Sequence, residues 1–117
     1  MNKRKLGQKK EQAAEEYLKA KGYQILARNF RNRSGEIDLI AKDADTVVFV
    51  EVKYRSAPDC GRAAEAVDWR KQKTITKVAR YYLMTHGGSE WTPCRFDVLA
   101  FDGDEMTHIP NAFYAGT

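Results

Sequence analysis

Hydrophobic positions recur along the chain with two different periods. In two segments they return every three to four residues, which predicts amphipathic helices, and elsewhere they form short runs bounded by turn residues, which predicts strands. In chain order we expect a helix (5–21), a strand (23–30), two strands on either side of KDADT (within 35–53), a loop (56–62), a helix (63–84) and a strand (94–102), with MTHIP (106–110) as a short last strand. The predicted order is αβββαβ with one extra strand.

Length and composition limit the class of protein. The chain has 117 residues, of which 43% are hydrophobic and 31% charged, so we expect one globular domain over residues 1–117. No segment approaches the roughly 18 apolar residues that a membrane span needs, and the basic start lacks the apolar stretch of an export signal. The two cysteines are too few for a disulfide framework. A cytoplasmic protein without a membrane partner is the expectation.

The segment GEIDLIAKDADTVVFVEVK (35–53) places charges inside runs that otherwise indicate buried strands. If its strands form a hairpin with a two-residue loop in the middle of KDADT, Asp38 lies directly opposite Glu51, where like charges are destabilising. Lys53 shares the face of Glu51 but neutralises only part of that charge. A divalent cation suits the remainder, because Mg²⁺ is held by one or two carboxylates together with water and phosphate oxygens. The alternative is a wet sheet end, at which the acids pair with Lys53 and Arg55.

Both faces of this hairpin are largely apolar. Ile37 is expected on the same face as Leu39 and Val50, while Ile40 and Phe49 are expected on the charged face. A sheet that is covered on both sides holds its charges in a partly desolvated crevice.

Helical phase brings further polar residues toward the sheet. Glu11 lies at the edge of the apolar arc of the first helix, whereas Glu15 points further outward. Lys71 and Gln72 fall within the apolar arc of the second helix, near its start. For a lysine, snorkelling along an apolar surface is the alternative explanation.

Basic residues gather in two blocks. Residues 1–33 carry ten lysines and arginines against three acids, and residues 70–80 carry five basic residues and no acid. Such blocks suit a polyanion, because neutralised phosphates release counterions, although solubility alone would also explain them. The residues expected to bind nucleic acid are Arg28, Arg31, Arg33, Arg70, Lys71, Lys73 and Lys77.

Isolated residues outside these patterns receive structural interpretations. Trp69 and Trp91 could stack on bases, but a tryptophan beside a helix is more often part of the core. His108 is expected at the surface or as a cap. Asp97 is not expected to pair with Arg95.

An acid in the first helix, then GEID and then EVK give the sequence a resemblance to the PD-(D/E)xK nuclease superfamily, which pairs an Asp on one strand with E-x-K on the next. More narrowly, the chain is similar to the YraN-like uncharacterised family, which resembles archaeal Holliday-junction resolvases. The matching stretches are AAEEYLKAKGYQILARNFRNRSGEIDLIAKD, VVFVEVKYR, VDWRKQKTI, RFDV and HIPNAF. In one departure, Lys10 stands before Glu11 where the family usually has glycine. The resemblance implies an α/β restriction-endonuclease-like αβββαβ core, with a mixed central sheet flanked by helices on both faces.

The hypothesis that follows is a Mg²⁺- or Mn²⁺-dependent DNA endonuclease that is selective for branched or flapped DNA. Asp38 and Glu51 would ligate the metal, with the carbonyl of Val52 as a further ligand. Lys53 would orient or activate the attacking water and stabilise the charge that develops on the phosphate.

Residues from the helices complete this hypothesis. Glu11 would hold a water of the metal, and Gln72 or Lys71 would position the scissile phosphate. Two alternatives stay open: a nucleic-acid-binding module without turnover, and an assembly partner whose acids only pair with basic neighbours. DNA is the expected partner, and assembly as a homodimer is left open.

Overall fold

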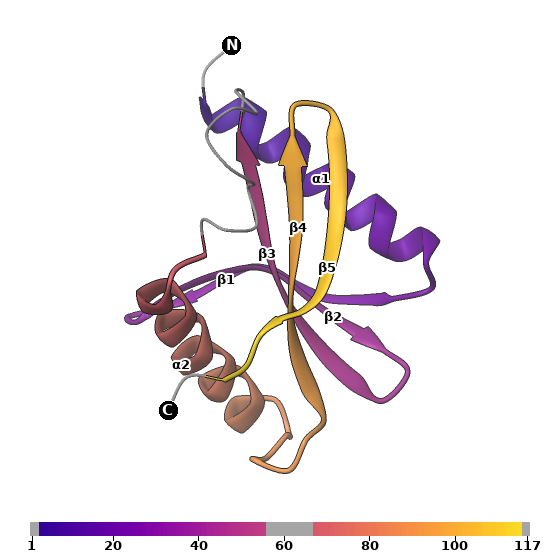
Figure 1. Ribbon diagram of the computed structural model, residues 1–117. Helices are drawn as coiled ribbons and strands as arrows, with labels where there is room; N and C mark the ends of the chain where they lie inside the picture. The colour runs from indigo at the N-terminus through magenta and orange to yellow at the C-terminus, as the bar shows by residue number, and fades with distance from the viewer. Residues whose placement is uncertain (1–2, 56–66, 116–117) are drawn as a thin grey trace.

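The computed structural model describes residues 3–55 and 67–115, with side chains from residue 7 to residue 54 in the first range. Its elements are α1 (Lys3–Ala20), β1 (Gln24–Asn32), β2 (Gly35–Asp43), β3 (Thr46–Arg55), α2 (Trp69–Thr85), β4 (Cys94–Asp102) and β5 (Glu105–Phe113). The predicted αβββαβ order is confirmed, and the short last strand is a full strand (Figure 1). The predicted loop 56–62 and residues 63–66 of the predicted second helix lie outside the described residues.

The five strands form one mixed sheet in the order β1-β2-β3-β4-β5. β3 and β4 are parallel, and the other neighbouring pairs are antiparallel. Parallel neighbours need a crossover connection, and α2 lies within the segment that joins β3 to β4. This architecture is consistent with a restriction-endonuclease-like fold, as predicted.

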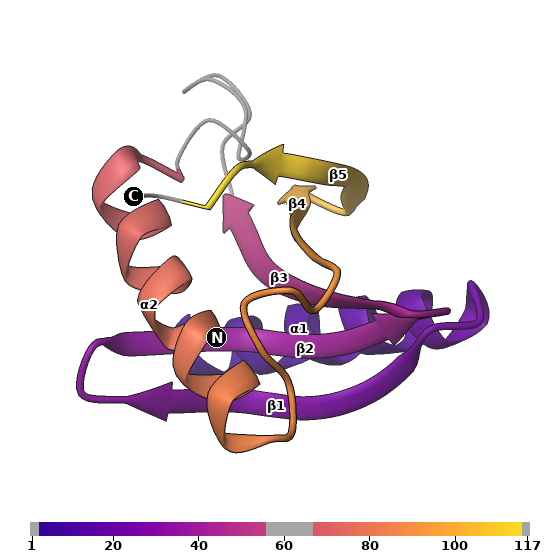
Figure 2. The ribbon, with the colours of Figure 1, turned by 90° about the horizontal axis from the view of Figure 1, so that it is seen from below.

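The two helices cover opposite faces of the sheet, which Figure 2 shows from below. Ala14 and Leu18 of α1 pack in a cluster with buried residues of β2, β3 and β4, while Ile75 and Val78 of α2 pack in a second cluster on the other face. A sheet buried on both faces needs apolar residues at successive positions, which explains the unbroken run from Val47 to Val50.

Helix α2 begins later than the apolar period predicts. Val67 and Asp68 are not helical, and the Asp68 side chain accepts a hydrogen bond from the Lys71 backbone N–H at 2.9 Å. An aspartate at this position satisfies one of the free N–H groups of the first turn, so it fixes the start of the helix at Trp69. The predicted start at residue 63 was wrong because Val67 is buried by tertiary packing without being helical.

The β1–β2 hairpin approaches α2 closely at Gly35. A Cβ atom built on Gly35 would lie 2.3 Å from the Thr74 Cγ2 atom. Only glycine therefore allows this contact, which holds the start of β2 against the middle of α2.

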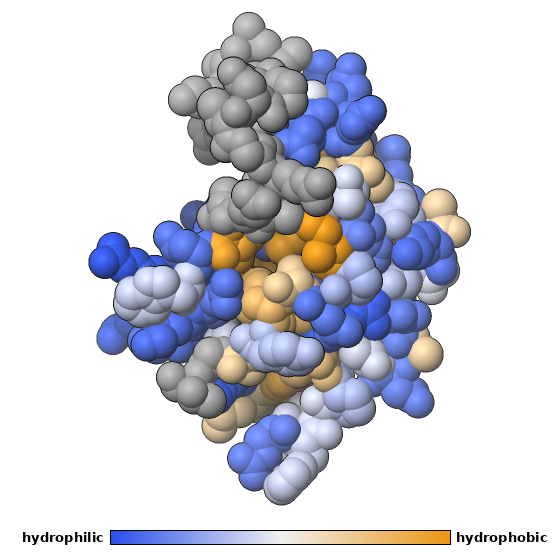
Figure 3. Space-filling model, viewed as in Figure 1, coloured by the Kyte–Doolittle hydropathy of each residue, from blue (hydrophilic) through white to orange (hydrophobic). Residues whose placement is uncertain are grey.

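Polar and apolar surface is unevenly distributed in Figure 3. Hydrophilic residues cover the outer side of α2 and the adjoining hairpin, whereas hydrophobic residues are visible between α2 and β5. Within the described residues, neither helix is long and apolar enough to cross a membrane.

Candidate functional site

Regular pairing between β2 and β3 ends where the two predicted carboxylates begin. The hairpin has the predicted register, and its last Cα pair is Leu39 with Val50. Asp38 and Glu51 are the next residues on the two strands. There the Val52 backbone N–H donates to the Asp38 Oδ2 atom at 2.8 Å. The Asp38 side chain thus provides the acceptor for a main-chain donor at the point where the backbone ladder stops.

Asp38 and Glu51 form a coupled and largely desolvated pair. Glu51 is only 5% exposed, and a hydrogen bond joins the two carboxyl groups. Burial, followed by the charge of Asp38, raises the pKa of Glu51 to about 7. Burial is also the main cause that raises the pKa of Asp38, although the Val52 N–H partly opposes it. The predicted alternative of a wet sheet end does not describe Glu51.

Two lysines approach Glu51 from different elements. The Lys53 Nζ atom lies 3.8 Å from Glu51 Oε1, and the Lys71 Nζ atom lies 3.6 Å from the same oxygen. Lys71 therefore reaches toward the sheet from the first turn of α2, as its helical phase predicts. Both ammonium groups lower the pKa of Glu51, but burial and Asp38 outweigh them.

Glu11 joins the site from α1 through an asparagine. In the amide orientation that satisfies its neighbours, Asn29 donates to Glu11 Oε1 at 3.0 Å and to Glu36 Oε1 at 3.3 Å. Burial, followed by the charges of Asp38 and Glu36, raises the pKa of Glu11. Glu11, Asn29 and Asp38 line a common cavity of about 310 Å³ between α1 and the β1–β2 hairpin. The predicted orientation of Glu11 toward the sheet is confirmed.

The backbone around Asp38 and Asn29 is irregular. Ile37 packs on the α2 side of the sheet and Leu39 on the α1 side, so the prediction that they share a face was wrong. Residues two apart share a face only in a regular strand, and opposite this point Asn29 has a positive φ of 48°. Asparagine tolerates this conformation better than most residues. Asn29 was missed by the sequence analysis, and an asparagine inside a strand run was the available signal.

Arg28 is already paired on the α1 side. Its guanidinium forms an ion pair with Glu15, whose carboxylate also contacts Lys19 at 3.2 Å. The Arg28 partner is the main cause that lowers the pKa of Glu15. The Glu15 side chain is 14% exposed, so the prediction that it points outward was wrong.

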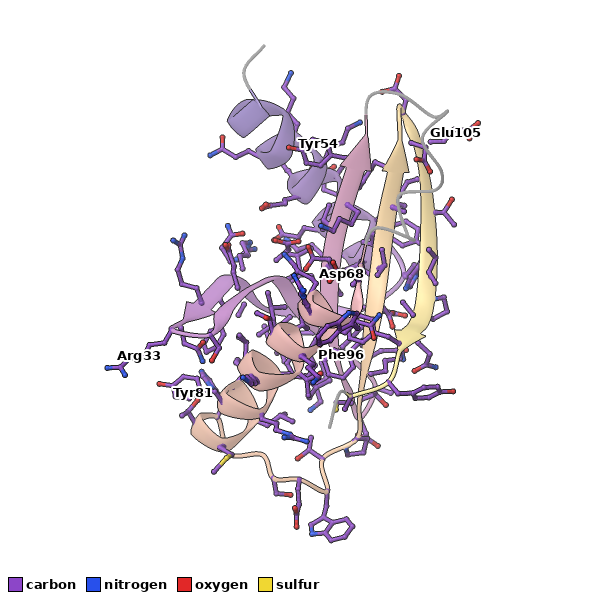
Figure 4. The ribbon with its side chains drawn as sticks, turned by 60° about the vertical axis from the view of Figure 1, so that its left-hand side comes forward. Arg33, Tyr54, Asp68, Tyr81, Phe96 and Glu105 are labelled. Carbon is purple, nitrogen blue, oxygen red and sulfur yellow. The ribbon has the colours of Figure 1, made fainter. Side chains whose placement is uncertain are left out.

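The remaining predicted basic residues lie on two sides of the site. Arg31 and Arg33 are exposed at the end of the β1–β2 hairpin, where Arg33 projects away from the molecule (Figure 4). In the same view Asp68 marks the start of α2 beside the strands. Gln72 is half-buried and donates from its amide to the Val67 carbonyl at 3.0 Å, so in this structure it caps local backbone. Also exposed on α2 are Arg70, Lys73 and Lys77.

The donor atoms at this site are carboxylate oxygens, which suit a hard divalent cation. Among the described residues, no group of three or more His, Cys, Asp and Glu side chains converges as a metal cage would. A cation held by Asp38 and Glu51 would therefore need water, main-chain or phosphate oxygens as further ligands. The main chain of Val52 lies beside Asp38 through its N–H. The role of its carbonyl stays a prediction.

A second polar cluster is buried at β4 and β5. Asp97 is fully buried and accepts hydrogen bonds from Arg95 Nε at 3.1 Å and from the Asn111 N–H at 3.1 Å. The His108 Nε2 atom lies 2.7 Å from Asp97 Oδ2. Arg95 and Asp97 pair because residues two apart share a strand face, so the prediction against this pair was wrong. His108 is part of a buried network and not a surface residue.

Both tryptophans are exposed, contrary to the prediction that they belong to the core. Trp69 is 61% exposed at the start of α2, and Trp91 is 83% exposed in the segment before β4.

The comparison with known proteins assigns the chain to a family. The model of the uncharacterised protein family UPF0102 matches residues 10–101. A UPF0102 protein of Lachnoclostridium phytofermentans is 50% identical over 115 residues, which are 98% of either chain. One of Aeromonas hydrophila is 50% identical over 108 residues, 92% of this chain and 83% of the relative, and one of Symbiobacterium thermophilum is 50% identical over 117 residues, 96% and 98%. The chain belongs to the UPF0102 family, the YraN-like family that its sequence resembles.

Proposed function

We propose that this protein is a Mg²⁺- or Mn²⁺-dependent DNA endonuclease of the PD-(D/E)xK type that acts on branched or flapped DNA. The observation that carries the proposal is the buried pair of Asp38 and Glu51, with Lys53 3.8 Å from Glu51. Two coupled carboxyls with raised pKa values are an unfavourable way to build a sheet, and perturbed groups of this kind gather at functional sites.

The site fits a divalent cation by its chemistry. Asp38 and Glu51 would hold the ion, and their mutual repulsion in a desolvated position is what a cation would relieve. Two carboxylates completed by water and substrate phosphate match the preference of Mg²⁺. When bound, the ion would supply Lewis-acid polarisation of a phosphoryl oxygen.

The protein residues have separable tasks in this proposal. Lys53 is close enough to Glu51 to be held in place, and its ammonium group would stabilise the negative charge that develops on the attacked phosphate. Lys71 approaches from α2 and would bind the same phosphate from a second direction. Glu11, joined to Glu36 through Asn29, would orient a water molecule at the cavity between α1 and the hairpin.

The surface around the carboxylates suits a phosphate backbone. Arg31 and Arg33 are exposed on the hairpin, and Arg70 and Lys73 are exposed on α2. Arginines and lysines in such positions bind phosphates without reading sequence, which favours recognition of DNA shape. Two basic elements separated by the site could hold two arms of a branched substrate.

The test is cleavage of labelled linear, flapped and four-way-junction DNA with Mg²⁺, Mn²⁺ or EDTA. We expect metal-dependent cleavage of the flapped or branched substrates. Lys53→Ala should lower the rate by roughly two or more orders of magnitude and leave calorimetric Mg²⁺ binding unchanged, because Lys53 acts mainly in the transition state. Lys42→Ala is the matched control, since Lys42 is an exposed lysine of β2 paired opposite Val47, away from the carboxylates.

Metal binding gives a separate measurement. Asp38→Asn and Glu51→Gln should each abolish Mg²⁺ binding in calorimetry, and unchanged binding in both variants would remove the proposed metal site. Tight DNA binding without cleavage of any substrate would instead favour a nucleic-acid-binding module.

A further inference from the structure

Trp69 is an exposed aromatic residue at the start of α2. Its side chain is 61% exposed, although tryptophan is one of the largest apolar side chains and most large apolar residues of this protein are in the core. An exposed apolar surface of this size is a mark of an interaction site when the surrounding residues point to a ligand.

The residues around Trp69 are positively charged. The Arg70 Cζ atom lies 5.5 Å from the centre of the indole, and the Lys73 Nζ atom lies 5.1 Å from it. The first turn of α2 contains no acid, and the preceding Asp68 is occupied with the Lys71 N–H. An aromatic face and two cations are the features that bind a nucleotide, since the ring stacks on the base and the cations contact phosphate.

Trp69 lies next to the proposed catalytic site along the chain. Lys71 is two residues later, and its Nζ atom is 3.6 Å from Glu51. Two helical positions are about 200° apart around the axis, so Lys71 faces the carboxylates while Trp69 lies on the other side of the same turn. A strand that crosses the start of α2 would meet Lys71 and then Trp69.

We propose that Trp69 is a stacking platform for an unpaired base of the DNA, one or a few nucleotides from the cleavage point. This inference rests on the proposed function in taking DNA as the ligand. In a duplex both faces of each internal base are already covered by its neighbours, so only an unpaired base offers a face to the indole without an unstacking cost. The contact would therefore select substrates with single-stranded DNA beside the cut.

The chain offers a matched control, because Trp69 and Trp91 are its only tryptophans. Trp91 is even more exposed, but it follows an acid, Glu90, and lies beyond the other end of α2. Trp91→Phe leaves Trp69 as the sole indole fluorophore.

The experiment titrates the Trp91→Phe protein in EDTA with a short single strand, with the same sequence as a blunt duplex, and with a flapped duplex. We expect quenching of Trp69 fluorescence by the single strand and the flap, and little by the blunt duplex. Trp69→Ala should weaken binding of the single strand and the flap by roughly 5- to 150-fold, while Trp69→Phe keeps most of the affinity. Trp91→Ala should leave all affinities unchanged.

Equal quenching by the blunt duplex, or unchanged single-strand affinity in Trp69→Ala, would overturn the inference. Because Trp69 is largely exposed, a thermal melt of Trp69→Ala should match wild type, so lost affinity can be separated from misfolding. If Trp69→Ala binds every DNA as wild type does and wild type still cuts with Mg²⁺, the stacking inference fails alone. If wild type stacks on single strands but cuts no substrate, the inference holds and the proposed nuclease activity fails.

Discussion

Replacing Glu51 by glutamine should stabilise the metal-free protein above neutral pH. Burial and Asp38 raise the pKa of Glu51 from 4.5 to about 7, so between these values the folded protein holds a proton that the unfolded chain releases. The stability contributed by that proton is fully present below about pH 4.5 and is lost as the pH rises through about 7. Glutamine has nearly the shape of glutamate and no charge to acquire.

The size of this effect follows from the two pKa values. A tenfold change in proton affinity is worth about 1.4 kcal/mol, so a pKa raised from 4.5 to about 7 corresponds to about 3 kcal/mol at high pH. The substitution also removes the contacts with Lys53 and Lys71, whose side chains are 28% and 41% exposed. Each such pair is worth at most about 1 kcal/mol. We therefore expect Glu51→Gln to gain about 1–3 kcal/mol near pH 8 and much less near pH 4.

Urea unfolding followed by circular dichroism, in EDTA and at a series of pH values, measures this difference directly. Glu16→Gln is the matched control, because Glu16 is an exposed glutamate of α1. Saturating Mg²⁺ should reverse the order, since a ligand at about 100 times its Kd stabilises only the protein that binds it by about 2.7 kcal/mol. If Glu51→Gln were clearly less stable than wild type near pH 8 in EDTA, the carboxylate would be a net stabilising ion-pair partner and our reasoning about the site would be wrong.

Three other regions give predictions of the same kind. Gly35→Ala should destabilise the protein by about 1–3 kcal/mol, because its Cβ would clash with Thr74 Cγ2, and Thr74→Ser in the same chain should restore part of the stability in urea unfolding. Asp97→Ala should cost about 3–5 kcal/mol in the same assay, since it leaves buried partners without their acceptor. Neutralising Arg31 and Arg33 together should flatten the log–log salt dependence of DNA affinity by up to about one unit for each phosphate that the variant no longer neutralises, and a slope equal to that of wild type would exclude the hairpin from the DNA surface.

The sequence predicted those parts of the site that depend on local periodicity. The alternation of apolar residues and the short KDADT turn fix the register of the β2–β3 hairpin, and this register brings Asp38 to Glu51. The helical period likewise places Glu11 and Lys71 on the sides of their helices that face the sheet. In each of these cases the side-chain direction follows from position within one element.

The sequence did not predict features that need two elements to be placed relative to each other. The pairing of Glu15 with Arg28 depends on how α1 crosses β1, and the burial of His108 depends on β5 pairing along β4. The switch of Ile37 to the α2 face depends on an irregular backbone opposite Asn29, which no alternation pattern contains. Such departures from regular geometry gather where a fold carries a functional site.

The balance of charge at the site argues against a purely structural role for its acids. The charges of neighbouring acids contribute to the raised pKa values of Glu11, Asp38 and Glu51, while Lys53 and Lys71 are the cations that contact Glu51. Arg28 is nearby but is already paired with Glu15. An assembly partner that needed only ion pairs would match its acids with cations, whereas here carboxyl groups outnumber the ammonium groups and are largely kept from solvent. A bound divalent cation would supply the missing positive charge, and a DNA phosphate would then find a cationic centre between two basic surfaces.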